Sequence, residues 1–104
     1  MATQTVTVAR IYLREGEHQL ATLIKLLHDE EKVSGVTVLR GIEGFGPDGK
    51  IHLASLLDLS LDLPLIVEFY DDPERVETIL RHLETHMGLS HVVTWPAQGR
   101  LHNR

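Results

Sequence analysis

A glycine-rich segment with two basic side chains is the part of the chain best suited to ligand chemistry. Residues 40–50, RGIEGFGPDGK, contain four glycines together with Arg40, Glu43 and Lys50. Because glycine allows positive φ and close backbone approach, several amide groups can converge on an anion while the basic side chains add charge. The segment indicates an anion-binding cradle, and the alternative is a glycine-rich turn that holds no ligand.

The same segment matches the phosphate loop of nucleotide hydrolases only in part. Residues 44–50 follow the pattern G-x-x-x-x-G-K, but Ile51 stands where a Ser or Thr must hold magnesium. Pro47 also removes one of the amides that would cradle phosphate. The glycine order does not fit a Rossmann fingerprint, which in addition requires a parallel sheet. A nucleotide-hydrolysing loop is therefore not predicted.

Histidines offer a second candidate chemistry. His82 and His86 are four residues apart, a spacing that on a helix can bring two imidazoles to one metal ion. The sequence fixes no third ligand nearby, so a pair of solvated histidines is the simpler interpretation and a metal site the alternative. No nucleophile elbow, kinase or zincin signature is present, and Glu43 with His52 on a glycine-rich loop is not a preorganised acid–base pair. We expect a binding protein, not an enzyme.

Length and composition limit the class of protein. A chain of 104 residues with 42% hydrophobic residues suits one domain with one core. The net charge of −5 disfavours nucleic-acid binding. The absence of cysteine excludes disulfides and Cys-ligated zinc, and no segment approaches the ~20 apolar residues that span a bilayer. These properties predict a cytoplasmic protein without membrane insertion.

Hydrophobic periodicity predicts the elements that must position these residues. Strands are expected at residues 5–13, 36–42, 65–70 and 91–95, with Pro96 ending the last. A first helix is predicted by the i, i+3, i+4, i+7 spacing of Leu20, Leu23, Ile24 and Leu27. Residues 34–35 are expected to end it. A second helix is expected to start at Asp72 and Pro73, where the Asp72 carboxylate can cap free amides, and to end at Gly88.

This order of elements predicts an α+β fold of the ferredoxin-like βαββαβ type. Two helices would cover one face of a four-stranded antiparallel sheet, in a single domain 1–104 with its core at about residues 5–96 and a tail at 97–104. Ile66 and Tyr70 would then leave the other sheet face apolar. An uncovered apolar face of this kind predicts self-association.

The connection at residues 44–64 is too long for a hairpin turn, which takes ~2–5 residues. Its second half is rich in leucine, at Leu53, Leu56, Leu57, Leu59, Leu61 and Leu63. The alternation predicts an additional strand or a core flap. The alternative is a surface that docks on a neighbouring subunit or a target protein.

Residues 40–46, RGIEGFG, and 51–68, IHLASLLDLSLDLPLIVE, closely resemble the PII-like family catalogued as domain of unknown function 190, in the GlnB/CutA-like superfamily. The resemblance extends from about residue 8 to about residue 95. It implies a ferredoxin-like fold assembled as a trimer, as in PII signalling proteins and CutA. In PII relatives the loop after the second strand is the signalling T-loop, and nucleotides bind in clefts between subunits at its base.

Carried over to this chain, the resemblance implies a ligand site formed by Arg40, Gly41, Glu43, Gly44, Gly46, Lys50 and His52. PII proteins have a glycine- and lysine-containing phosphate loop after the second helix, whereas this chain has only GLSH at 88–91. The reduced set favours AMP, another small adenine nucleotide or another anion over ATP. The resemblance implies signal transduction by a regulatory protein that acts on a transporter, channel or enzyme. A CutA-like metal-binding protein is the alternative.

Overall fold

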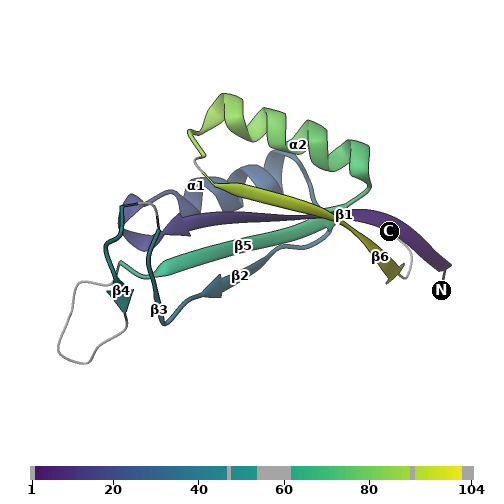
Figure 1. Cartoon of the computed structure of the whole chain (residues 1–104). Coiled ribbons are helices and arrows are strands. Elements are labelled where there is room, and N and C mark those ends of the chain that lie inside the picture. The colour runs from purple at the N-terminus through teal and green to yellow at the C-terminus, as the bar shows by residue number, and fades with distance from the viewer. Residues whose placement is uncertain (1, 47, 54–61, 90, 102–104) are drawn as a thin grey trace.

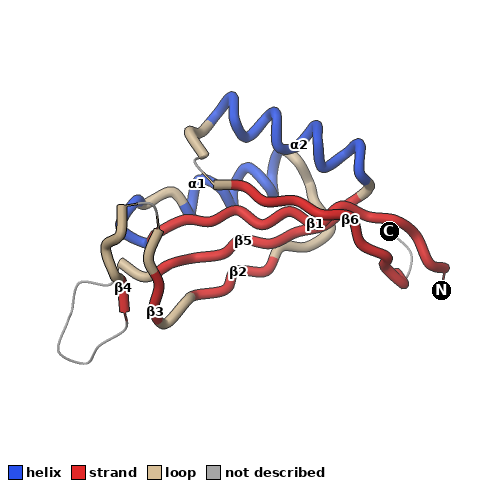
Figure 2. The backbone as a smooth tube through the Cα atoms, in the orientation of Figure 1, coloured by secondary structure: helices blue, strands red, loops and turns tan. Residues whose placement is uncertain are grey.

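A computed structural model describes residues 2–46, 48–53, 62–89 and 91–101, and it shows the expected sandwich of two helices on one face of a sheet (Figures 1 and 2). The main elements are β1 (Ala2–Arg14), α1 (Leu20–Lys25), β2 (Thr37–Arg40), β5 (Pro64–Asp71), α2 (Pro73–His86) and β6 (Val92–Leu101). The sheet is antiparallel, with strand order β2-β5-β1-β6. The ferredoxin-like α+β fold is confirmed.

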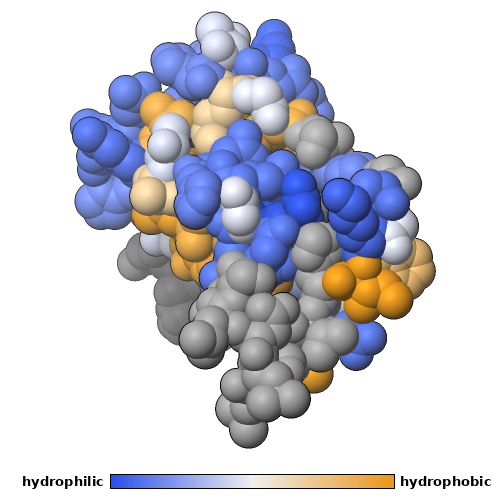
Figure 3. Space-filling view, turned by 90° about the vertical axis from the view of Figure 1, so that its left-hand side faces the viewer, coloured by the Kyte–Doolittle hydropathy of each residue, from blue (hydrophilic) through white to orange (hydrophobic). Residues whose placement is uncertain are grey.

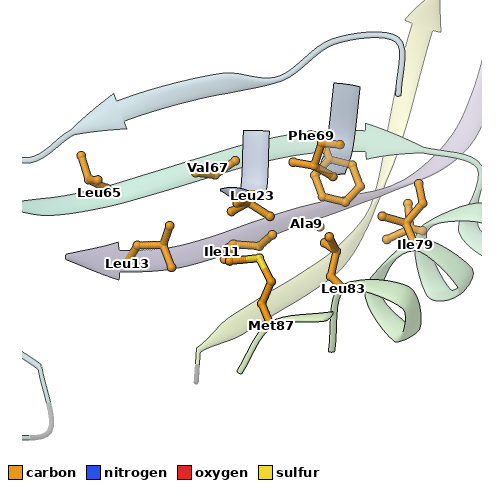
Figure 4. Close-up of a cluster of buried hydrophobic side chains, with 12 residues drawn as sticks. Ala9, Ile11, Leu13, Leu23, Leu65, Val67, Phe69, Ile79, Leu83 and Met87 are labelled. Carbon is orange, nitrogen blue, oxygen red and sulfur yellow. The ribbon is translucent and has the colours of Figure 1, made fainter. Parts of the chain in front are cut away.

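The hydrophobic core lies between this sheet and the two helices (Figure 4). Alternate residues of the two central strands point into it, as the period of two requires, while α1 and α2 contribute residues spaced three or four apart. The labelled members are Ala9, Ile11, Leu13, Leu23, Leu65, Val67, Phe69, Ile79, Leu83 and Met87. The intervening strand residues, among them Ile66 and Tyr70, face away from the helices, as predicted.

The last strand is longer than the sequence pattern indicates, and its predicted end at Pro96 is wrong. Strand β6 continues through Pro96, which pairs with Thr7, to Leu101, which pairs with Ala2. Proline is tolerated because β6 is an edge strand, where a missing N–H need not break a ladder. Residues 97–101 thus belong to the sheet instead of a tail, while residues 102–104 lie outside the described part of the chain.

Both helices differ in detail from the prediction. The first passes into a π-helical turn, Leu26–Glu30, and so ends before residues 34–35. The second begins at Pro73 as expected, but the Asp72 carboxylate makes no capping hydrogen bond. Instead, the Asp72 N–H donates to the Asp71 carboxylate at 2.7 Å.

No helix in the described part of the chain is both long and apolar enough to cross a bilayer.

Arg75 links the start of α2 to the connection between α1 and β2. Its Nε lies 3.0 Å from Oδ2 of Asp71, whose side chain is only 1% exposed. Its Nη2 donates to the backbone carbonyl of Glu31. A buried carboxylate needs such partners because its desolvation is costly.

We therefore expect Arg75→Ala to lower the free energy of unfolding by about 1–3 kcal/mol, since it leaves a buried acceptor short of a charged donor. Urea denaturation measures the loss. Arg81→Ala, which removes the same charge from an exposed position of α2, should change the stability by less than about 0.5 kcal/mol. Equal losses in the two variants would contradict the role given to Arg75.

Candidate functional site

A cavity of about 770 Å³ opens at the end of the sheet that carries the glycine-rich segment. Its floor comes from the end of β1 and the start of β5, which pair as Leu13 with Leu65 and Arg14 with Pro64. Tyr12, Ile66 and Val93 complete an apolar floor. Seen from this end of the molecule, hydrophobic residues lie in separate groups between hydrophilic ones (Figure 3). An apolar cavity with a few polar groups is typical of a small-ligand site.

Glycines bring the wall of the cavity close to its floor. Gly41 donates its N–H to the Pro64 carbonyl at 2.7 Å, and a Cβ on Gly41 would lie 2.7 Å from Cγ of Pro64. A larger residue would push the segment away from β5, so this position requires glycine. The chain then forms a short hairpin of β3 (Glu43–Gly44) and β4 (His52–Leu53), in which Gly44 pairs with His52.

The 3₁₀ helix Glu15–Glu17, which follows β1, forms hydrogen bonds at both ends of the chain segment that connects β2 to β5. At the entrance, Nη2 of Arg40 lies 3.1 Å from Oε2 of Glu15. At the exit, Gly16 donates its N–H to Oδ1 of Asp62 at 2.7 Å, and Glu15 donates its N–H to the Leu63 carbonyl at 3.0 Å. Residues 54–61, and with them most of the predicted additional strand or flap, lie outside the described residues.

The structure brings together four of the seven residues predicted to bind ligand. These four line the cavity: Gly41, Glu43, Gly44 and Gly46. Arg40 does not, because its guanidinium pairs with Glu15, and this hydrogen bond raises the pKa of Arg40 above its ordinary value. The exposed Lys50 is also absent from the lining, and of His52 only the backbone lies within the described residues.

Several lining residues were not predicted from the sequence. Arg14, Glu17, Asp48 and His91 join the cavity from β1, the 3₁₀ helix, the glycine-rich segment and the residue before β6. Only the strand register places Arg14 beside Pro64, so no local motif could have shown it. The described lining residues thus include one arginine and three acidic residues, counting Glu43. These described residues alone offer a phosphate little net attraction.

The two histidines of the metal alternative are not assembled into a site. Nδ1 of His82 lies 3.0 Å from Oε1 of Glu31, and Nδ1 of His86 lies 2.8 Å from the His82 carbonyl. Within residues 2–46, 48–53, 62–89 and 91–101, no group of three or more histidine or acidic side chains is arranged to hold a metal ion. The described structure thus gives these histidines no third ligand.

The helix-free face of the sheet is apolar and joins the cavity. Exposed hydrophobic side chains on it are Tyr12, Leu39, Tyr70, Val93 and Trp95. An ion pair also lies on this face. Nε of Arg10 lies 2.7 Å from Oε1 of Glu68, and the guanidinium carbon lies 5.5 Å from the centre of the Trp95 ring. The hydrogen bond to Glu68 raises the pKa of Arg10. Tyr12 and Val93 also line the cavity, so anything that covers this face borders the cavity.

Comparison with known proteins gives a consistent result. The family model described as "Uncharacterized ACR, COG1993", domain of unknown function 190, matches residues 6–99. A UPF0166 protein of Methanocaldococcus jannaschii is 36% identical over 81 residues, 73% of each chain.

Among solved structures, CPII of Thiomonas intermedia K12, a nitrogen regulatory PII-like protein bound to ADP, AMP and bicarbonate, superposes with a TM-score of 0.68 at 20% identity. The match covers 94% of this chain and 91% of CPII. CutA1 of Oryza sativa superposes with a TM-score of 0.54 at 13% identity, covering 97% and 85%. At these identities the structural matches show a shared fold.

Proposed function

Since this chain belongs to the family catalogued as domain of unknown function 190, we propose that it is a PII-like regulatory protein that binds an adenine nucleotide in clefts between identical subunits. The single observation that carries the proposal is the position of the cavity. It lies at the base of the connection 44–64 and opens onto the apolar sheet face. The structure that resembles this chain most in fold among those described above holds ADP and AMP.

Self-association explains two features of the chain at once. Tyr70 and Trp95 are 46% and 37% exposed on the helix-free face, which a second copy would cover. A second copy would also border the cavity through Tyr12 and Val93 and so add side chains to it. This addition is needed because carboxylates outnumber guanidinium groups in the described lining. We propose a homo-oligomer, in keeping with the trimer implied by the family resemblance.

Regulation would follow from the connection 44–64, whose base forms part of the cavity. A ligand can change what this connection contacts only if it binds its two states with different affinity. The target would be another protein, such as a transporter, channel or enzyme. The role is binding and not catalysis.

Isothermal titration with ADP and AMP tests the proposal. We expect both to bind the wild-type protein, and Gly46→Val to weaken binding by about tenfold or more, because the new side chain lies in the lining of the cavity. Gly35→Val is the matched control, since at both glycines a Cβ would meet no atom of the described residues within 4 Å, yet Gly35 lies outside the cavity lining. No heat from either nucleotide, or equal weakening in both variants, would refute the proposed site.

The metal-binding alternative has less support in this structure. The His82 and His86 Nδ1 atoms contact Glu31 and a backbone carbonyl, and the CutA1 match shows the fold alone. Titration with zinc, with His82→Ala as the variant, distinguishes the alternatives in the same experiment. Zinc heat that disappears in this variant would favour the CutA-like function.

A further inference from the structure

Arg14 is the arginine that the described cavity lining contains, and it already has an acidic partner. Its Nη1 lies 3.1 Å from Oδ2 of Asp62. The two side chains are 41% and 32% exposed, so solvent and solutes reach both. Asp62 itself is not part of the lining, whereas Arg14 is. Arg14 therefore belongs to the cavity lining and also pairs with a carboxylate at the exit of the connection 44–64.

The Asp62 carboxylate is held in place for this contact. Its Oδ1 accepts the Gly16 N–H at 2.7 Å, and a Cβ on Gly16 would lie 2.7 Å from the same oxygen. The next residue, Leu63, is buried and accepts the Glu15 N–H at 3.0 Å. A side chain at residue 16 would therefore displace the carboxylate from this position. A carboxylate fixed in this way can hold the guanidinium without a large loss of its own side-chain freedom.

We propose that the Asp62 carboxylate competes with the anionic group of the ligand for Arg14. When the ligand binds, Arg14 would exchange the Asp62 carboxylate for this group. The inference rests on the proposed function, because it concerns the phosphate of a nucleotide in the same cavity. A guanidinium forms paired hydrogen bonds with phosphate as readily as with carboxylate. A partly exposed ion pair is weak, so the exchange costs little.

Two carboxylates of the lining accept hydrogen bonds from backbone N–H groups. Oε1 of Glu17 accepts the Arg14 backbone N–H at 2.8 Å, and Oδ1 of Asp48 accepts the Lys50 N–H at 2.9 Å. The structure shows the guanidinium of Arg14 bound to Asp62, at the exit of the connection. Exchange of this partner changes the contacts of residue 62 and so links occupancy of the cavity to the exit of the connection.

Titration of ADP into charge-neutral variants tests the exchange. Asp62→Asn keeps an oxygen for the Gly16 N–H but removes the charge that holds Arg14, and we expect it to bind ADP about two- to sixfold more tightly at low salt, the range that a weak ion pair allows. Arg14→Gln should bind ADP more weakly. Glu31→Gln is the control, because it removes one negative charge beside His82, outside the cavity lining.

The double variant separates competition from simple repulsion. If Asp62 acts by occupying Arg14, the gain from Asp62→Asn disappears when Arg14 is already glutamine. A gain that persists in the Arg14→Gln background, or no gain in wild-type background, overturns the inference while the proposed function stands. If neither the wild type nor Asp62→Asn binds ADP or AMP, the proposed function fails and the inference fails with it.

Discussion

Leu39→Glu is expected to convert the proposed oligomer into a monomer at micromolar concentration. Leu39 lies on the helix-free face of β2, paired with Ile66, and is 44% exposed in one chain. If a second copy covers this face, the substitution buries a carboxylate with no partner. Such burial costs about 3–5 kcal/mol, which raises the dissociation constant by about 10²- to 10⁴-fold. Light scattering coupled to size exclusion measures the mass directly.

The adjacent residue provides a closely matched control. Val38 is 40% exposed on the same strand, but its pairing with Val67 places it on the face that carries the helices. Val38→Glu therefore introduces the same charge at nearly the same exposure on the opposite face, and it should leave the oligomer intact. A wild-type protein that is already monomeric, or equal dissociation in both variants, would refute the covered sheet face and with it the cleft between subunits.

Local patterns predicted most of the fold because they report which face of an element is buried. The alternation through Leu65, Val67 and Phe69 identified a core strand, and these three residues are all buried. The start of α2 was predictable from Pro73, whose fixed φ suits the first helical turn. The extension of β6 was not predictable, because residues 97–101 gain their strand conformation from pairing with residues 2–6, more than ninety positions away.

The candidate site was predictable only in its glycine-rich half. Glycines mark close backbone approach along the chain, and Gly41 does approach Pro64. The positions of the basic groups were not predictable, for a different reason. Arg40 was predicted to attract an anion, but folding brings it to Glu15, while Arg14 reaches the cavity from another strand. Which arginine reaches the cavity depends on contacts between residues that are distant in sequence, and a single sequence contains no signal for such contacts.

Truncation of two neighbouring residues of β5 is expected to change the free energy of unfolding by very different amounts. Phe69 is 1% exposed in the core, whereas Tyr70 is 46% exposed on the helix-free face. In the monomeric Leu39→Glu background, Phe69→Ala should lower the free energy of unfolding by about 3–5 kcal/mol through lost burial and a cavity. In the same background Tyr70→Ala should change it by less than about 0.5 kcal/mol. Urea denaturation measures both, and Phe69→Leu gives a smaller loss should the alanine variant not fold.

In the wild-type background the same tyrosine should behave differently. If another copy covers Tyr70, its truncation removes an aromatic contact from the interface, and Tyr70→Ala should cost about 1–3 kcal/mol per subunit. This cost depends on protein concentration, because association and folding are then linked. The cost of Phe69→Ala should be similar in both backgrounds, since the core of one subunit is complete without a partner. A cost for Tyr70→Ala that is equally small in both backgrounds would show that the face is exposed in solution and that the cavity is formed by one chain alone.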